Sequence, residues 1–140
     1  RRAIKLVDGG SQKRSFTFID DAIDCLLRMM DNPDGKATQR IFNIGNPDNC
    51  VSIEDLARRI VRIAAEFPVL TERARATSIE MVTADAYYGK YYQDIQLRVP
   101  RIDAVREALG WRPSTDLDTA IRRTIEYYVN KGPTGAGGPD

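Results

Sequence analysis

The residues best suited to chemistry lie between Tyr87 and Pro100, a stretch that holds four of the six tyrosines together with Gly89, Lys90 and Arg98. Tyrosine offers a flat apolar face and a hydroxyl, and arginine offers a planar fork of donors that fits a carboxylate or a phosphate. The stretch follows neither the helical nor the strand period, so it is predicted to be a loop. It suits a flat anionic ligand, or else it packs as a tyrosine-rich loop over the edge of a core.

A second candidate is the turn Asp8-Gly9-Gly10, which two cations, Lys13 and Arg14, follow closely. Backbone N–H groups of such a turn can converge on a phosphate with the cations beside them. The alternative is a β-hairpin with a solvated basic tip. The sequence leaves both interpretations open at this point.

Composition narrows the classes of function. The chain has 140 residues, 42% hydrophobic and 29% charged, with 21 Lys and Arg against 20 Asp and Glu. That predicts one globular domain with no basic stripe, so neither a nucleic-acid nor a membrane partner is expected. Cys25 and Cys50 stand alone and are expected to be reduced thiols of a cytoplasmic protein. The absence of histidine excludes Ser-His and Cys-His nucleophiles and most catalytic zinc sites, and no metal site is predicted.

Apolar periodicity predicts the elements that must position these groups. Strands are expected at 3–7, 15–19, 40–45 and 77–83. Helices are expected from Asp20 or Asp21 to about Asp31, from Ser52 to about Phe67, over Arg101–Leu109 and from Leu117 to about Lys131. Short strands mixed with four helices predict an α/β or mixed α+β small domain without an internal repeat.

The ends of these helices carry recognisable signals. Asp20 or Asp21 is expected to cap the first helix, and Ser52 the second. Thr115 with Asp118 is the expected capping pair of the last helix, and Gly110 suits the C-terminal position of the helix before it.

The faces of the helices are also predicted. The first helix is expected to pack an apolar face into the core, formed by Ile23, Leu26, Leu27 and Met30. The last helix is expected to bury Leu117, Ile121, Ile125 and Tyr128. The second helix is expected to turn a solvated face to water, formed by Arg58, Arg59 and Arg62.

Three segments together resemble the C-terminal, substrate-binding part of the extended short-chain dehydrogenase/reductases that act on nucleotide sugars, the NAD-dependent epimerase/dehydratase superfamily. These are 14–22 (RSFTFIDDA), 42–47 (FNIGNP) followed by 52–56 (SIEDL), and 108–113 (ALGWRP). The segments are common across that superfamily. They therefore imply the fold, a substrate-binding lobe without the Rossmann nucleotide-binding core, and little about the substrate.

Two further stretches, 5–14 and 87–94 with Arg98 six residues after Tyr92, resemble the ArnA-type UDP-glucuronic acid decarboxylases of polymyxin resistance. Those enzymes oxidise C4 of UDP-glucuronic acid with NAD and then release carbon dioxide, giving a UDP-4-keto-pentose for the aminoarabinose modification of lipid A. The resemblance implies that Tyr92 contacts the substrate and that Arg98 is the catalytic arginine, described as a proton donor. It implies that the UDP-sugar is held by Lys5, Leu6, Val7, Asp8, Gly9, Gly10, Ser11, Gln12, Lys13 and Arg14. Because arginine releases its proton only with difficulty, an electrostatic role or a relay through water is the better physical interpretation of Arg98.

Other hallmarks of that superfamily are missing from the sequence. There is no Gly-x-x-Gly-x-x-Gly turn in a βαβ setting and no Tyr-x-x-x-Lys pair, because Ala86 stands four residues before Lys90. The expectation is therefore a nucleotide-sugar-binding domain over 1–131, a disordered Gly/Pro-rich tail over 132–140, and NAD bound by an N-terminal half absent from this chain. Such a fragment is expected to be inactive and monomeric by itself, and the full-length protein to be a homo-oligomer.

Two other functions stay open. A 4-epimerase, a 4,6-dehydratase or a UDP-xylose synthase would share the same fold segments, although an epimerase or dehydratase has no need of an arginine at position 98. A non-catalytic binding module is the third possibility, and the direct start of the chain in a predicted strand argues against it.

Overall fold

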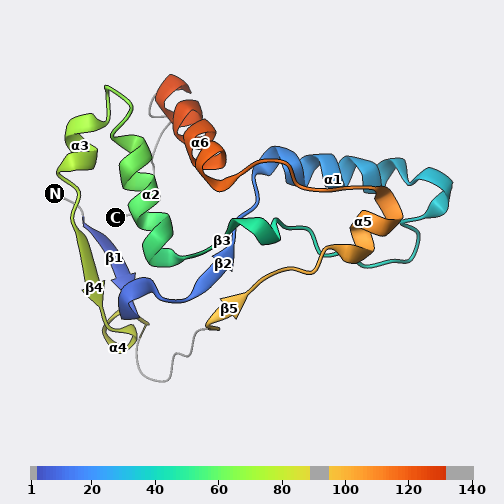
Figure 1. Cartoon of the computed structure of the whole chain (residues 1–140), viewed down its shortest axis with the longest axis horizontal. Coiled ribbons are helices and arrows are strands. Elements are labelled where there is room, and N and C mark those ends of the chain that lie inside the picture. The colour runs from blue at the N-terminus through green and yellow to red at the C-terminus, as the bar shows by residue number, and fades with distance from the viewer. Residues whose placement is uncertain (1–2, 89–94, 132–140) are drawn as a thin grey trace.

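The computed structural model describes residues 3–88 and 95–131, a mixed α/β arrangement in which helices outweigh short strands (Figure 1). The strands are β1 (Ile4–Val7), β2 (Lys13–Ser15), β3 (Cys50–Ser52), β4 (Ile79–Val82) and β5 (Leu97–Arg98). The helices are α1 (Ile19–Asp31), α2 (Ile53–Ala64), α3 (Thr71–Arg75), α4 (Ala84–Tyr88), α5 (Asp103–Leu109) and α6 (Leu117–Lys131). Short 3-10 turns are η1 (Asp8–Gly10), η2 (Pro33–Gly35) and η3 (Pro47–Asn49).

The strands form two small sheets. β1 pairs with β4 in parallel, and β2 lies between β3, which is antiparallel to it, and β5, which is parallel to it. β1 and β2 therefore belong to different sheets, and the hairpin alternative for the Asp8–Gly10 turn is wrong. In Figure 1 the first sheet, α2, α3 and α6 gather at one end of the molecule, and α1 and α5 lie at the other.

Helices α2 and α6 pack around Ile63, Leu117 and Ile121, which are buried. Two of the arginines predicted to face solvent on α2 also form ion pairs with α6. Arg59 and Arg62 both form ion pairs with Asp118 in the first turn of α6, and the hydrogen bond from Arg62, then that from Arg59, lowers the Asp118 pKa despite partial burial. The predicted solvated face is confirmed, since Arg58 and Arg62 are exposed and Arg59 is partly exposed; the ion pairs form because α6 runs beside this edge of α2. These partly exposed pairs orient the two helices and add little stability.

The second cluster of buried side chains joins α1 to α5 and contains Cys25, Val105, Leu109 and Trp111. Cys25 and Cys50 are both free thiols, as predicted. The apolar face that was expected to be buried on α1 is instead exposed along its length. Cys25 and Met29 turn the other side of the helix toward the core, so the predicted face has no cover among the described residues.

Two predicted strands and one predicted core residue differ in the structure. Residues 40–45 form no strand, because no described strand pairs with them. Of the predicted strand 15–19, Ser15 belongs to β2, while Ile19 already opens α1. Tyr128, expected in the core, is exposed on α6. Among the described residues, no helix is long and apolar enough to cross a bilayer.

Some predicted caps are confirmed and others are wrong. Ser52 Oγ accepts a hydrogen bond from Asp55 N at 3.0 Å, and Gly110 ends α5 at φ +62°. The last helix is capped by Asp116 instead of Thr115: Asp116 Oδ1 accepts from Thr119 N at 3.0 Å. On α1 the N-cap position is Phe18, with no side-chain cap, two or three residues before the predicted cap at Asp20 or Asp21.

Asp21 is a buried carboxylate in the first turn of α1, with 8% of its surface exposed. Its Oδ1 accepts from the backbone N (3.3 Å) and the hydroxyl (3.1 Å) of Ser114, and its Oδ2 accepts from Thr115 N at 3.0 Å. Its backbone oxygen accepts from Trp111 Nε1 at 3.0 Å. Asp21 therefore does not cap its own helix but holds the segment that leads into α6.

We predict that Asp21→Asn lowers the free energy of unfolding at pH 7 by about 1–3 kcal/mol, because donors buried around the carboxylate lose part of their acceptor. Burial raises the pKa of Asp21, but the hydrogen bonds from Thr115 and Ser114 outweigh that effect and leave the pKa below its usual value. Its stabilising contribution is therefore present above the unfolded-state pKa of about 3.9 and is lost as pH falls through the lower folded-state pKa.

Urea unfolding of the unmodified chain and of the Asp21→Asn variant, from pH 7 down to pH 2, measures this difference in the free energy of unfolding. The matched control is Asp20→Asn, since Asp20 lies in the same turn and is exposed. Equal losses for the two variants, or a gap between them that does not narrow in acid, would contradict the prediction.

Candidate functional site

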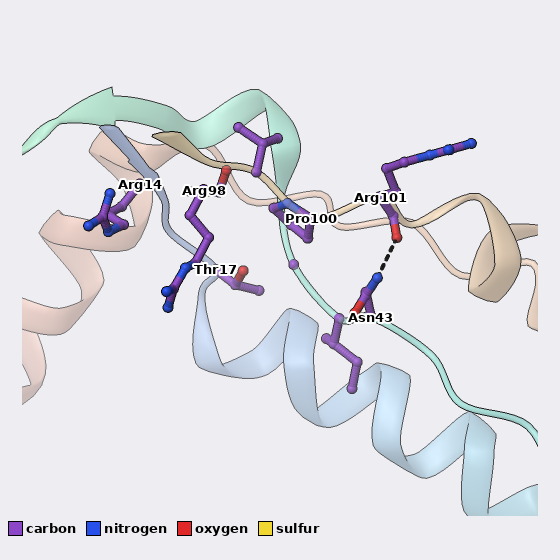
Figure 2. A pocket seen from close by; sticks show the side chains of 10 residues that line it. Arg14, Thr17, Asn43, Arg98, Pro100 and Arg101 are labelled. Carbon is purple, nitrogen blue, oxygen red and sulfur yellow. Dashed lines mark hydrogen bonds between the residues drawn. The ribbon is translucent and has the colours of Figure 1, made fainter. Parts of the chain in front are cut away.

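A cleft of about 520 Å³ opens between β2, β5 and the extended chain around Gly45 (Figure 2). It is lined by Arg14, Ser15, Thr17, Asn43, Ile44, Gly45, Arg98, Val99, Pro100 and Arg101. Three of these described lining residues are arginines and none is an acid. Ser15 adds a hydroxyl that is buried without a hydrogen-bond partner in the described part of the chain. The cleft is therefore suited to an anion with several polar groups.

Arg14 and Arg98 face each other across neighbouring strands. β2 and β5 pair in parallel with Arg14 opposite Arg98, so the side chains leave the sheet on the same side. Figure 2 shows both guanidinium groups reaching toward one side of the cleft, while Arg101 extends away from them. Two like charges in register repel each other, so the pair favours a ligand that brings negative charge.

The two arginines are held differently. Arg14 Nη1 donates to the backbone oxygens of Lys13 at 2.8 Å and of Ile95 at 2.6 Å, so Arg14 also secures the strand that carries Arg98. The Arg98 side chain is exposed, and its guanidinium has no hydrogen bond or ion pair with the described residues. Arg98 thus has the more available donors of the two.

The opposite wall is set by a close approach of the Gly45 backbone to the ring of Pro100. A Cβ built on Gly45 would overlap Pro100 Cγ and lie 3.0 Å from Pro100 Cβ, so no larger residue fits there without movement. Asn43 Nδ2 donates to the Arg101 oxygen at 3.3 Å beside it (Figure 2). These two contacts place the chain that follows Arg98.

Buried amides connect this wall to the rest of the fold. Asn46 N donates to Thr17 Oγ1 at 3.0 Å, and Asn46 Nδ2 donates to the Thr115 oxygen at 3.1 Å. Asn49 Nδ2 donates to the same oxygen at 3.0 Å and to the Phe16 oxygen at 3.1 Å. Thr115 is also the residue whose backbone N–H donates to Asp21, so hydrogen bonds link the wall of the cleft to the buried carboxylate.

A neighbouring cleft of about 560 Å³ lies on the other side of Val99–Arg101 and contains Arg106 and Arg112. It also contains two acids, Asp48 and Asp103. Asp103 pairs with Arg106 at 2.6 Å and approaches Arg101 at 3.5 Å. Part of the positive charge of this neighbouring cleft is therefore already neutralised. The cleft between Arg14 and Arg98 is the better site for an anion.

Of the predicted UDP-sugar-binding residues, one lines the cleft. The ten predicted to hold the UDP-sugar are Lys5, Leu6, Val7, Asp8, Gly9, Gly10, Ser11, Gln12, Lys13 and Arg14; all ten are described, and Arg14 lines the cleft. Leu6 is buried in the core, and Asp8 Oδ1 accepts from Ala84 N at 2.9 Å. Tyr92 lies outside the described residues.

Sequence reasoning missed the residues that form the wall opposite the arginines: Thr17, Asn43, Gly45 and Pro100. All but Pro100 lie in segments that were interpreted as markers of the fold. The usable signal was the isolated glycine of the Asn-Ile-Gly-Asn stretch, since a glycine between apolar and polar residues often marks a close backbone approach.

The turn at Gly9 and Gly10 does not have the geometry of a dinucleotide-binding turn. The turn at Gly9 and Gly10 leads into the extended strand β2 instead of a helix, and a Cβ on Gly10 would lie 2.9 Å from Glu54 N. Its glycines therefore let the chain pack against the start of α2, and no cradle for NAD is formed there. Nor do the described Cys, Asp and Glu residues form a group of three or more that could hold a metal ion.

Comparison with known proteins finds one matching family model and several solved structures with a similar fold. Residues 1–45 match the model of the NAD dependent epimerase/dehydratase family. The PbgP3 protein from Burkholderia pseudomallei is 38% identical with a TM-score of 0.79, over 92% of this chain and 35% of that chain. Pal from Bacillus thuringiensis is 20% identical with a TM-score of 0.68, over 93% of this chain and 36% of that chain.

A third match is the UDP-glucuronic acid 4-epimerase from Bacillus cereus, solved in complex with UDP-glucuronic acid and NAD. It is 16% identical with a TM-score of 0.67, over 91% of this chain and 36% of that chain. The chain thus spans about a third of the length of the structures it matches. The likeness confirms the predicted fold class, a small mixed α/β domain with an epimerase/dehydratase-like fold.

The contact between Gly45 and Pro100 yields a prediction. Gly45→Ala should lower the free energy of unfolding by about 1–3 kcal/mol, as overpacking does, because the new methyl group displaces Pro100. Pro100→Ala in the same chain removes Cγ and Cδ, so it should restore most of that loss. Urea unfolding of both single variants and the double variant measures the coupling. Strictly additive losses would show that the two residues do not constrain each other.

Proposed function

We propose that this chain is the substrate-binding part of an NAD-dependent UDP-glucuronic acid oxidative decarboxylase, with residues 1–131 as its nucleotide-sugar-binding domain. One observation carries the proposal: Arg14 and Arg98 lie in register at a cleft whose described lining holds no acid. UDP-glucuronic acid has two anionic groups, the pyrophosphate and the sugar carboxylate. A pair of arginines on neighbouring strands matches that distribution of charge.

The two arginines suit different ends of the ligand. Their Cα atoms start about 5 Å apart, and long side chains can diverge from there to reach two anions. Arg14 is tied to backbone oxygens and suits the pyrophosphate, which needs a fixed donor. Arg98 has its donors available and suits the sugar carboxylate. Lys13 alternates with Arg14 along β2, so its side chain leaves the strand on the opposite side.

The proposed chemistry needs an electrostatic role for Arg98. NAD, which would be held outside the described residues, supplies the oxidation at C4 that turns the sugar into a β-keto acid. The bond from C5 to the carboxyl carbon then breaks, its electron pair forms an enolate at O4, carbon dioxide leaves and C5 takes a proton.

Negative charge moves in this step from the carboxylate to O4. Arg98 accelerates the step only where it binds the enolate better than the carboxylate, because catalysis requires stronger interaction in the transition state. An arginine stays protonated near neutral pH, so the proton that reaches C5 comes from another donor or through water.

The alternative is another nucleotide-sugar enzyme of the same fold. The likeness to the Bacillus cereus UDP-glucuronic acid 4-epimerase supports it, because a carboxylate-binding arginine would also suit an enzyme that keeps the carboxylate. The product separates the two proposals. A decarboxylase releases carbon dioxide and yields a keto-pentose, whereas an epimerase returns a sugar of unchanged mass.

We predict that Arg98→Ala reduces carbon dioxide release by about 100-fold or more, the usual cost of removing a donor to a developing oxyanion. The measurement uses the chain joined to its NAD-binding half, with UDP-glucuronic acid and NAD. The affinity for UDP alone should change little, because Arg98 is assigned to the sugar end. Arg101→Ala is the matched control: Arg101 lines the same cleft, its side chain is 89% exposed and it points away from the pair. Full decarboxylation by the Arg98 variant would refute the assigned role.

The 140-residue chain alone should reduce no NAD when it is mixed with UDP-glucuronic acid, because NAD is assigned to a part outside the described residues and the Gly9–Gly10 turn leads into a strand instead of a helix. Absorbance of NADH at saturating substrate tests this. Steady NADH formation by the purified chain, abolished by Arg98→Ala, would show that it contains a complete active site.

A further inference from the structure

The cleft of about 560 Å³ on the other side of Val99–Arg101 has no part in the proposed chemistry. Three separate parts of the chain form it, and the lining residues are Pro47, Asp48, Val99, Pro100, Arg101, Ile102, Asp103, Arg106, Arg112 and Pro113. Figure 2 shows the Arg101 side chain reaching away from Arg14 and Arg98. The volume of this second cleft lies within the roughly 300–1,000 Å³ that small-molecule sites occupy.

The three arginines of the second cleft differ in how far their charge is already satisfied. Arg106 pairs with Asp103 at 2.6 Å. Arg101 approaches the same carboxylate only at 3.5 Å, and its side chain is 89% exposed. The guanidinium of Arg112 has no hydrogen bond or ion pair with the described residues. Arg101 and Arg112 therefore have donors left for a ligand.

Asp48 supplies an acceptor to the same cleft. Its backbone N–H donates to Asn46 Oδ1 at 3.1 Å, which fixes the turn that carries it. Its carboxylate has no hydrogen bond or ion pair with the described residues, and Arg112 does not neutralise it although both line the cleft. A ligand that satisfies both residues carries an anionic group at one point and a hydroxyl or N–H donor at another.

Three prolines make the walls of the second cleft rigid. Pro47, Pro100 and Pro113 each have a backbone angle fixed by the ring, and Pro100 is also packed against Gly45. Walls that are fixed before a ligand arrives lose little conformational freedom on binding. The proline rings also give apolar surface, which suits the C–H groups of a carbon skeleton better than a bare ion.

We propose that the second cleft binds a phosphate monoester of a hydroxylated carbon skeleton, such as a sugar phosphate. The phosphate lies between Arg101 and Arg112, a hydroxyl donates to Asp48, and the skeleton rests on the prolines. A phosphate monoester carries close to two negative charges near neutral pH, so it suits two arginines and leaves the pair of Asp103 with Arg106 intact. A carboxylate carries half that charge and competes less well with the two acids of the lining. This site is separate from the one assigned to the UDP-sugar.

NMR titration of the 140-residue chain with glucose 1-phosphate tests the proposal. The chain carries Arg98→Ala, so that the first cleft binds anions less well, and the Nε–H signals of Arg101 and Arg112 are assigned with Arg→Lys variants. Both signals should shift and saturate at millimolar ligand. Arg112→Gln should raise the Kd by at least about tenfold, because it removes a charged donor. The matched control is Arg75→Gln, at an exposed position outside the cleft, which should leave the Kd within about twofold.

A second variant tests the role of Asp48. The chain should bind glucose 1-phosphate more tightly than inorganic phosphate, and Asp48→Ala should reduce that preference by at least about threefold, because the hydroxyl loses its acceptor. A ratio of two affinities is used because removing an acid also strengthens the binding of every anion. An unchanged Tm of each variant shows that the losses are not losses of folding.

Several outcomes would overturn the proposal. Shifts that stay linear up to the highest concentration would show that no site exists, and equal effects of the Arg112 and Arg75 variants would reduce the binding to general attraction of charge. Gluconate bound as tightly as glucose 1-phosphate would make the ligand a carboxylate instead. No preference over inorganic phosphate would remove the role of Asp48. None of these measurements depends on turnover, so this site and the proposed decarboxylation can fail separately.

Discussion

The buried carboxylate of Asp21 is the interaction on which the remainder of the described structure depends. It joins the first turn of α1 to Ser114 and Thr115, more than ninety residues later in the chain. Thr115 then uses its backbone oxygen to hold two buried amides, those of Asn46 and Asn49, which fix the wall of the cleft. A buried ionised group is tolerated only when donors surround it, so this region has one arrangement that satisfies every partner.

The geometry of the cleft depends on these hydrogen bonds and on one short pair of strands. β5 has two residues, and its pairing with β2 sets Arg98 opposite Arg14. On the far side, Gly45 admits Pro100 at a distance that any side chain would prevent. The β2–β5 pairing and the Gly45–Pro100 contact together place both guanidinium groups at the same cleft. Their combined positive charge is the physical basis for assigning an anionic ligand to the cleft.

Local signals in the sequence predicted much of the fold, and long-range contacts account for the errors. The Ser52 cap and the Gly110 helix end were predictable because each depends on a few neighbouring residues. Asp21 was interpreted as a cap because its partners lie far along the chain. The exposed side of α1 was predicted to be buried and 40–45 to be a strand, because periodicity records the spacing of apolar residues and not which neighbours cover or pair with them. For the site, residue chemistry singled out the arginines, whereas Gly45 acts through backbone contact that composition does not reveal.

The most direct test of the central claim observes the two guanidinium groups. Side-chain Nε–H signals of Arg14 and Arg98, assigned with Arg→Lys variants, would be followed by NMR as UDP-glucuronic acid or UDP-glucose is added at millimolar concentration. The account predicts that Arg14 responds to both ligands and that Arg98 responds strongly only to the one with a carboxylate. An Arg98 signal that is unmoved, or that moves equally with both, would contradict it.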